Sequence, residues 1–227
     1  MTEKLETKLE TTSDTDEQIE YHSNGKISGK YRFQKGKLHG EVLLYDENSQ
    51  LTDRMTYKNG RLNGLTTIYD EEGRPAQLIN YKNDKMEGEA QFFDEGLLLS
   101  KMNYKRDLLE GLAVHYHDHG GIRGKVNYKD DKMHGESLWY NEKGGLMQKS
   151  NYTAGKFDGE SLEYHENGKI SKYACFEDNK PVGEIKIYYP NGKAQKIIYH
   201  QEGTPYAEEE YDAKGRKTRK EYKVEAA

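Results

Sequence analysis

The residue types of a metal site occur together at one place in this sequence, the run HYHDH at 115–119. Its histidines and aspartate are zinc-binding residue types, but a competent zinc site needs three or four converging ligands. His117 also has counterparts at His22 and His165, each directly after a tyrosine. We therefore interpret His117 as a repeat residue and predict no metal site.

A glutamate that follows a glycine recurs along the chain and could supply paired carboxylates for acid–base catalysis. Such a pair requires a cleft in which the two carboxyl pKa values are driven apart. A glutamate once per period along regular strands predicts instead a solvated row of charge beside lysines. The glutamates in question are Glu41, Glu89, Glu136, Glu160 and Glu184.

Three other patterns give no catalytic or cofactor site. Ser161, His165 and Asp158 have the residue types of a hydrolase triad, but no nucleophile elbow surrounds the serine. Cys175 has no sequence neighbour that would lower the pKa of its thiol. The phosphate-loop pattern G-x-x-x-x-G-K-[ST] does not occur. We predict no catalytic residue, no metal and no cofactor, and therefore no enzyme.

Composition limits the class of protein. Apolar and charged residues each make up 33% of the chain, a balance that by itself favours disorder. The 19 tyrosines and 23 regularly spaced glycines favour instead a chain folded around aromatic rings. The net charge is −5 and no long basic run occurs, so nucleic acid is not expected as a partner.

The compartment is predicted from what the sequence lacks. One cysteine allows no intrachain disulfide, and no apolar run is long enough to span a membrane. No signal peptide is visible at the start, which favours the cytoplasm. A periplasmic location stays open if a leader has been removed.

A 24-residue repeat runs through the chain, and each repeat contains two 12-residue units. Type A units resemble KNGRLNGLTTIY (58–69), type B units resemble DEEGRPAQLINY (70–81), and both end on an aromatic ring. One unit has 11 residues and ends at Tyr104. The repeated rings include Tyr57, Tyr69, Tyr81, Tyr128, Tyr140, Tyr152 and Tyr164, and a marker glycine recurs at Gly64, Gly88, Gly111, Gly135, Gly159 and Gly183.

Each unit combines a glycine-containing turn with a short segment rich in Tyr, Ile, Leu, Thr and Val, which is typical of a strand. Strands so close in sequence must pair antiparallel. The fold class predicted is therefore all-β, an elongated antiparallel meander in a single twisted sheet with two strands per repeat. We assign 19–222 to the repeat domain, 1–18 to a disordered acidic tail and 223–227 to a second tail.

Turn length decides which face of the sheet each ring occupies. HENGK at 165–169 predicts a three-residue loop with Gly168 in the left-handed conformation. If every loop has an odd length, all rings share one face, whereas two-residue loops would place alternate rings on opposite faces. We adopt the odd loop, so the buried face is expected to carry the rings with Met55, Ile79, Met102, Val126, Leu43, Val114, Leu138 and Leu162.

On this assumption the opposite face carries the residue that precedes each type A ring, including the only tryptophan. Binding energy concentrates in few residues, and tryptophan is enriched among them. An alternative is that Trp139 packs in a small cluster and binds nothing, since single exposed apolar residues are common. The predicted partner surface consists of Phe92, His115, Trp139, Lys125, Lys149, Asn127 and Asn151.

The segments YHSNGKI (21–27), KGKLHGE (35–41), KDDKMHGE (129–136) and YHENGKI (164–170) resemble the MORN repeat in its bacterial variant form. This chain is similar to the YwqK-type antitoxins, a resemblance that implies an immunity protein that binds a toxin or effector protein. Other MORN proteins are scaffolds or membrane-peripheral modules, but the acidic balance argues against a membrane role. The oligomeric state is not predicted. Asp84, Asp107 and Asp131 depart from the pattern by replacing the first turn glycine, and Pro181 is a further departure.

Overall fold

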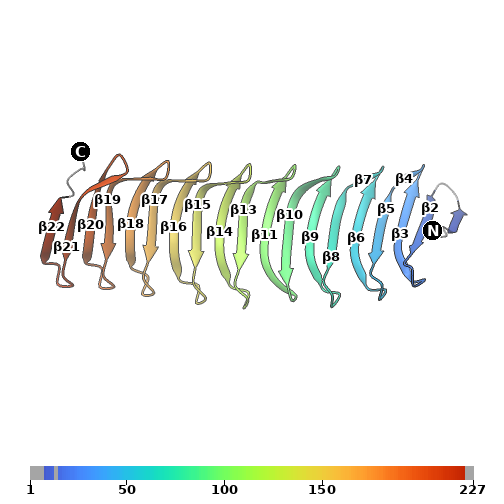
Figure 1. Ribbon diagram of the computed structural model, residues 1–227, viewed down its shortest axis with the longest axis horizontal. Coiled ribbons are helices and arrows are strands. Elements are labelled where there is room, and N and C mark those ends of the chain that lie inside the picture. Colours follow the sequence, from blue (N-terminus) through green and yellow to red (C-terminus); the bar gives the residue numbers. More distant parts are fainter. Residues whose placement is uncertain (1–7, 13–14, 223–227) are drawn as a thin grey trace. The chain divides into compact units, whose positions relative to one another are not determined.

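A computed structural model describes the backbone of residues 8–12 and 15–222 as antiparallel strands joined by tight turns, with no helix in that part of the chain (Figure 1). No segment there could therefore cross a membrane as a helix. The Cα positions fall into two compact units, unit 1 (1–109) and unit 2 (110–227). Neighbouring strands pair antiparallel within each unit, so the predicted all-β meander is confirmed.

Each unit is a series of short strands. Unit 1 contains β1 (Lys8–Thr12), β2 (Thr15–Tyr21), β3 (Ile27–Gln34), β4 (Lys37–Leu38), β5 (Gly40–Tyr45), β6 (Leu51–Lys58), β7 (Arg61–Leu62), β8 (Gly64–Tyr69), β9 (Pro75–Lys82), β10 (Lys85–Asp94), β11 (Leu97–Lys105) and β12 (Leu108–Leu109). Unit 2 contains β13 (Gly111–Tyr116), β14 (Ile122–Lys129), β15 (Lys132–Tyr140), β16 (Leu146–Thr153), β17 (Lys156–Tyr164), β18 (Ile170–Glu177), β19 (Lys180–Tyr188), β20 (Ala194–Gln201), β21 (Thr204–Tyr211) and β22 (Lys217–Tyr222).

The sheet of unit 1 begins before the predicted boundary at residue 19. β2 starts at Thr15, which pairs with Gln34 of β3, and β1 pairs with β2. The sequence showed no strand here because this segment is polar, whereas the pairing uses backbone groups that every residue carries. The rest of the two predicted tails, 1–7, 13–14 and 223–227, lies outside the described residues.

The turns that precede type B strands have three-residue loops, as predicted from HENGK. The amide of His165 donates to the carbonyl of Lys169 (2.8 Å), and the amide of Gly168 donates to the carbonyl of His165 (2.9 Å). Gly168 has φ of 78°, the left-handed conformation that glycine adopts without steric cost.

The turns that precede type A strands have two-residue loops, which makes the odd-loop assumption wrong for half of the turns. Lys58 pairs directly with Arg61, and the two residues between them, Asn59 and Gly60, have φ of 54° and 82°. Positive φ at both central residues defines the type I′ turn, for which Asn-Gly is the strongest sequence signal.

The even turns divide the predicted buried face into two. Val42 pairs with Met55 on one face, while Leu43 pairs with Arg54 on the other. We call the face with Met55 the packed face. As predicted, it also carries Ile79, Met102 and Val126, together with the type B rings. The prediction was wrong for Leu43, Val114, Leu138 and Leu162, which lie on the opposite face beside Arg54, Lys125, Lys149 and Tyr173.

The type A rings follow the opposite face. Tyr45 alternates with Leu43 along β5, and Lys30, which pairs with Leu43, has its Nζ 5.8 Å from the centre of the Tyr45 ring. The predicted single ring face is therefore replaced by two ring columns, with type B rings on the packed face and type A rings on the opposite face.

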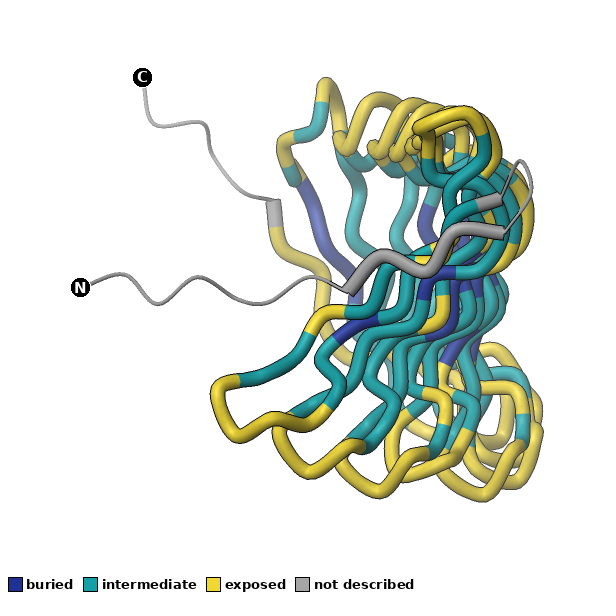
Figure 2. The backbone as a smooth tube through the Cα atoms, turned by 90° about the vertical axis from the view of Figure 1, so that its right-hand side faces the viewer, coloured by how far each residue is buried: buried dark blue, intermediate teal, exposed yellow. Residues whose placement is uncertain are grey.

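The core lies on the packed face, in the middle of the strands, while the turns at both edges are exposed (Figure 2). In unit 2, Tyr152 packs on Phe157 with ring centres 4.5 Å apart, and Phe157 packs on Phe176 at 5.3 Å. The most buried apolar residues of the packed face are Val42, Ile79, Ala90, Ala113, Val126 and Ala174, while Ala207 is buried on the opposite face, where it pairs with Tyr199.

The marker glycine and the 11-residue unit both have a backbone explanation. Gly88 and Gly135 have φ of 97° and 85° at the point where a type A strand leaves regular pairing, so the repeat requires glycine there. In the short unit, Asp94 pairs with Leu97, so a two-residue turn replaces the three-residue one. The missing residue is therefore a loop residue.

Candidate binding surface

The recurring glutamates form ion pairs on the opposite face rather than a catalytic pair. Glu136 Oε2 lies 2.6 Å from Lys149 Nζ, and Glu41 Oε1 lies 3.5 Å from Arg54 Nε. The hydrogen bond to Glu136 raises the pKa of Lys149. All four side chains are substantially exposed, so these pairs form the solvated charge row that the spacing predicted.

The asparagines that precede type B rings connect neighbouring strands. Asn127 Nδ2 donates to the carbonyl of Glu136 (2.8 Å), and Asn151 Nδ2 donates to the carbonyl of Glu160 (3.2 Å). Asn80 makes the same bond to Glu89 in unit 1 (2.8 Å). Since these amides bind the sheet's own backbone, Asn127 and Asn151 are not free polar groups of the predicted partner surface.

The histidines of the three-residue turns connect successive repeats. His117 Nε2 lies 3.2 Å from the carbonyl oxygen of Tyr140, and His165 Nε2 lies 2.9 Å from that of Tyr188. His22 makes the equivalent contact with Tyr45 at 2.8 Å. The prediction that His117 is a repeat residue is confirmed. The described residues contain no group of three or more ligands arranged to hold a metal ion.

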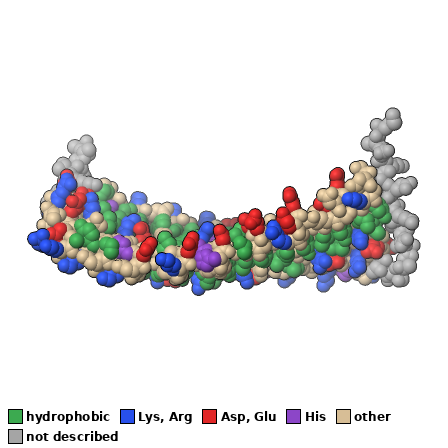
Figure 3. Space-filling model, turned by 90° about the horizontal axis from the view of Figure 1, so that it is seen from below, with side chains coloured by type: hydrophobic (Ala, Val, Ile, Leu, Met, Phe, Trp, Pro, Cys, Tyr) green, Lys and Arg blue, Asp and Glu red, His purple; other side chains and the backbone are tan. Residues whose placement is uncertain are grey.

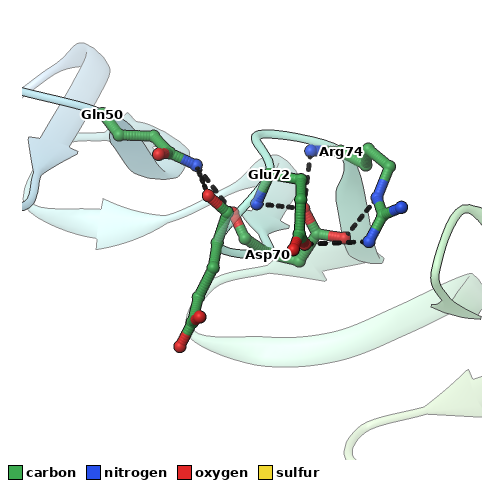
Figure 4. Close-up of polar contacts among 5 residues, drawn as sticks. Gln50, Asp70, Glu72 and Arg74 are labelled. Atoms are coloured by element: carbon green, nitrogen blue, oxygen red, sulfur yellow. Dashed lines mark hydrogen bonds and ion pairs between the residues drawn. The ribbon is translucent and has the colours of Figure 1, made fainter.

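Polar side chains also stabilise the turn edge of unit 1 (Figure 4). Asp70 Oδ1 accepts the amides of Glu72 (3.1 Å) and Arg74 (2.8 Å), while Asp70 Oδ2 lies 2.7 Å from Arg74 Nε. Burial opposes the charged carboxylate, but the hydrogen bonds from Arg74 lower the pKa of Asp70 overall. Gln50 donates from the preceding repeat to the Asp70 carbonyl (3.0 Å).

The aspartates that replace the first turn glycine have a structural role at the other edge. Asp84 Oδ1 accepts the amide of Leu62 (2.8 Å), and Asp107 Oδ1 accepts the amide of Met86 (2.7 Å). Both aspartates have positive φ, 69° and 75°. Each carboxylate therefore joins its turn to the preceding repeat.

Trp139 lies on the packed face and not on the face where the sequence placed it. It pairs with Gly124 and Gln148, and its ring stacks on His115 with centres 5.8 Å apart and planes 11° apart. A Cβ at Gly124 would lie 2.7 Å from the Trp139 ring, so the indole covers the glycine. Burial, with a smaller contribution from Arg123, lowers the pKa of His115.

The seven residues of the predicted partner surface therefore do not form one surface. His115 and Trp139 lie on the packed face of unit 2, and Phe92 lies on the packed face of unit 1, opposite Gln77 and Ser100. Lys125, Lys149, Asn127 and Asn151 lie on the opposite face of unit 2. The physical cause is the two-residue turn, which reverses the face of every type A strand relative to the odd-loop expectation.

Sequence reasoning overlooked Leu112, which occupies in its repeat the position of Glu41 and Glu136. Its side chain is 41% exposed on the opposite face of unit 2. Lys125 on the neighbouring strand has no ion pair among the described residues. The sequence did indicate this residue, because most repeats have a glutamate directly after the marker glycine and this repeat has a leucine.

An open hollow near the end of unit 2 is lined by residues that include Ile187, Tyr189 and Lys196. Lys196 Nζ is already paired with Glu208 (3.0 Å) and Glu210 (3.6 Å). The charges of the hollow are therefore compensated within the chain.

The geometry of these repeats agrees with a comparison against protein families. The MORN repeat variant family matches six segments, which together cover more than half of the chain: 38–59, 62–83, 109–130, 133–154, 157–178 and 181–202. The chain belongs to the MORN repeat variant family. Each MORN match starts at the second residue after a two-residue turn, as at Leu62 and Phe157. This residue lies on the packed face. The repeat with the 11-residue unit lies between the second and third matches.

No curated protein matches the chain. Among solved structures, a chain of the Photorhabdus luminescens Tc holotoxin pore carrying the TccC3-D651A mutation is similar, with 12% sequence identity and a TM-score of 0.22. The match covers 92% of this chain and 15% of that chain. A similarity of this level carries no argument about the fold or the function of the MORN repeat chain.

Proposed function

We propose that this chain is a non-enzymatic binding protein whose sheet faces hold a protein partner. The observation that carries the proposal is the exposure of large apolar side chains, Leu65 (45%) in unit 1 and Leu112 (41%) and Met147 (51%) in unit 2. Exposed apolar surface bordered by polar groups is typical of interaction sites. Acidic, basic and hydrophobic side chains are interleaved along the surface seen in Figure 3.

The use of the polar side chains supports binding over catalysis. The recurring Glu, Asn, His and Asp residues are engaged in ion pairs with neighbouring strands or hydrogen bonds to neighbouring backbone. Catalysis requires instead a convergent set of nucleophile, base and charge-stabilising donors in a pocket.

We further propose that the partner is a toxin or effector protein, which would make the chain a cytoplasmic immunity protein. The support is the resemblance of the chain, built almost entirely of MORN repeats, to the YwqK-type antitoxins. The second candidate, a MORN-type scaffold, is favoured by the same exposed apolar side chains if they bind a structural partner.

The test is capture from the native source with the tagged full chain, followed by co-expression of each captured protein with and without the chain. The immunity proposal expects a captured protein that arrests growth alone and is harmless with the chain. Capture of structural proteins that never arrest growth would replace it with the scaffold. Turnover of a small molecule by the purified chain would contradict the binding role.

A further inference from the structure

On the opposite face, two hairpins pair a glutamate with a cation on the neighbouring strand, and one hairpin of unit 2 keeps the cation without the glutamate. Lys149 on β16 is neutralised by Glu136 on β15, and Arg54 on β6 is neutralised by Glu41 on β5. In the β13–β14 hairpin the cation is retained as Lys125, but the glutamate position is occupied by Leu112. The substitution removes a carboxylate and at the same time exposes an apolar side chain.

The surroundings of Lys125 are apolar and aromatic. Its direct partners on the two neighbouring strands are Val114 and Leu138, both partly exposed. Tyr116 and Tyr140 lie two residues further along the same strand faces. We call Leu112, Val114, Tyr116, Lys125, Leu138 and Tyr140 the Lys125 surface. Among the described residues, Lys125 forms no ion pair, so this surface has an uncompensated positive charge at its centre.

Unit 1 shows that the repeat does not require this cation. At the equivalent repeat there, Leu65 replaces the glutamate and Leu78 replaces the cation, so both members of the pair are absent together. Lys125 is retained although its partner is missing. The sheet forms with either arrangement, so Lys125 is available for a carboxylate from outside the chain.

We propose that the Lys125 surface binds an acidic segment of a protein partner, whose carboxylate takes the place of the missing glutamate beside Lys125. The apolar side chains of that segment pack against Leu112, Val114 and Leu138. The proposal rests on the binding function proposed above and names the chemistry of the partner. A protein segment fits better than an anionic membrane because one cation, with Glu136 on the same face, gives no basic patch.

The test uses a short synthetic peptide of alternating Leu and Glu as the probe, with an alternating Leu and Lys peptide as the charge control. Binding to the full chain is followed by fluorescence anisotropy. In Leu112→Glu the restored carboxylate should pair with Lys125 and weaken binding at least ~10-fold, or about 1.4 kcal/mol. Leu65→Glu is the matched control, because it adds the same charge at the equivalent position of unit 1, and it should bind as the wild type does.

A second variant, Lys125→Leu, introduces the residue that unit 1 carries at the equivalent position, Leu78. This variant should also lose binding of the Leu and Glu peptide. Circular dichroism should show that both variants fold, since each introduces a residue that other repeats already carry at that position. Equal affinity for the two peptides, or equal losses in Leu112→Glu and Leu65→Glu, would overturn the proposal. So would loss of binding in Trp139→Leu with Leu112→Glu unaffected, because the packed face would then be the interface.

Two outcomes separate this inference from the proposed function. Binding of the Leu and Glu peptide by a chain that protects no cell from a captured protein would support the Lys125 surface and count against the immunity role. Binding of phosphatidylserine vesicles, with neither peptide bound, would overturn the inference in favour of a membrane surface.

Discussion

The central pairs of the packed face differ between β5–β6 and β10–β11 of unit 1 and β15–β16 of unit 2, on the same backbone repeat. In unit 1 the central pairs include a large aliphatic residue, as in Val42 with Met55 and Ala90 with Met102. In unit 2 the equivalent pair Ser137–Ser150 is small, and Ser150 Oγ lies 2.9 Å from Ser161 Oγ. The same backbone repeat therefore accepts a large aliphatic residue or two small serines at its central pair, and of these serines Ser150 is hydrogen-bonded while Ser137 Oγ has no partner.

The largest expected effect comes from the aromatic cover of unit 2. Phe157→Ala removes a ring that packs on both Tyr152 and Phe176 and should destabilise unit 2 by about 3–4 kcal/mol. Met86→Ala at the equivalent position of unit 1, where Met86 pairs with Tyr81, should cost less, about 2 kcal/mol, because it removes no aromatic ring. Amide hydrogen exchange resolves the two units separately, since losses in a repeat array stay near the altered repeat. A larger loss from Met86→Ala would reverse the comparison.

Gly124→Ala should have a smaller effect that is specific to unit 2. The new methyl group would displace the Trp139 ring, which we expect to cost about 1–3 kcal/mol and to change the tryptophan fluorescence. Unit 1 has Ser100 at the equivalent position, so the backbone itself accepts a side chain there. Ser100→Ala serves as the control and should leave stability nearly unchanged. Unaltered tryptophan fluorescence in Gly124→Ala would show that the indole does not cover this glycine.

Two buried hydroxyl groups, Ser150 in unit 2 and Thr66 in unit 1, predict stability changes of opposite sign. Ser150→Ala leaves Ser161 and Gln148 without their shared partner and should cost about 1 kcal/mol. Thr66 Oγ1 is buried in unit 1 with no hydrogen-bond partner. Thr66→Val should therefore leave stability unchanged or raise it by up to about 1 kcal/mol. Chemical denaturation measures the free energy of unfolding of both variants. Equal destabilisation would mean that the Thr66 hydroxyl has a hydrogen-bond partner.

Acid should affect the end of unit 2 through Glu209. Hydrogen bonds from Lys217 and from the Tyr211 hydroxyl lower the pKa of Glu209 to about 2. Because its folded-state pKa lies below the ordinary 4.5, Glu209 stabilises the fold fully above that value and loses this contribution as pH falls toward 2. Melting of Glu209→Gln should therefore depend less on pH between about 4.5 and 2 than melting of the wild type. An identical pH dependence would contradict the Lys217 contact.

The fold could be predicted from the sequence because the spacing of the rings and marker glycines holds in all but the repeat with the 11-residue unit. The three-residue turn at HENGK, the glutamate row and the role of His117 were all predicted from the types and spacing of those residues. Single side chains could not be assigned to a face, because that assignment depends on the parity of every loop. Asn59-Gly60 has the sequence of a two-residue turn, but the position of the glycine in DEEG (70–73) and NEKG (141–144) favoured an odd loop, which was assumed for every turn.

The residues predicted as one partner surface are divided between two faces for the same reason. Trp139 and Lys125 are close in the sequence pattern, yet they occupy opposite faces once the type I′ turns are counted. The packing of the Trp139 indole over Gly124 and the hydrogen bond from Asn127 to the carbonyl of Glu136 are contacts between neighbouring strands. The sequence of one 12-residue unit does not reveal such contacts. Leu112 could have been found from the sequence by comparing it with the glutamates of the same row.

The face assignment of Trp139 and Lys125 is tested most directly by nuclear Overhauser contacts of the Trp139 indole in the labelled full chain. The structure predicts strong contacts from the indole protons to the Gly124 α-protons and to the His115 ring, and none to the Lys125 side chain. Contacts between the indole and the Lys125 methylene groups, without contacts to Gly124, would contradict it. That result would restore a single ring face and remove the basis of the Lys125 surface.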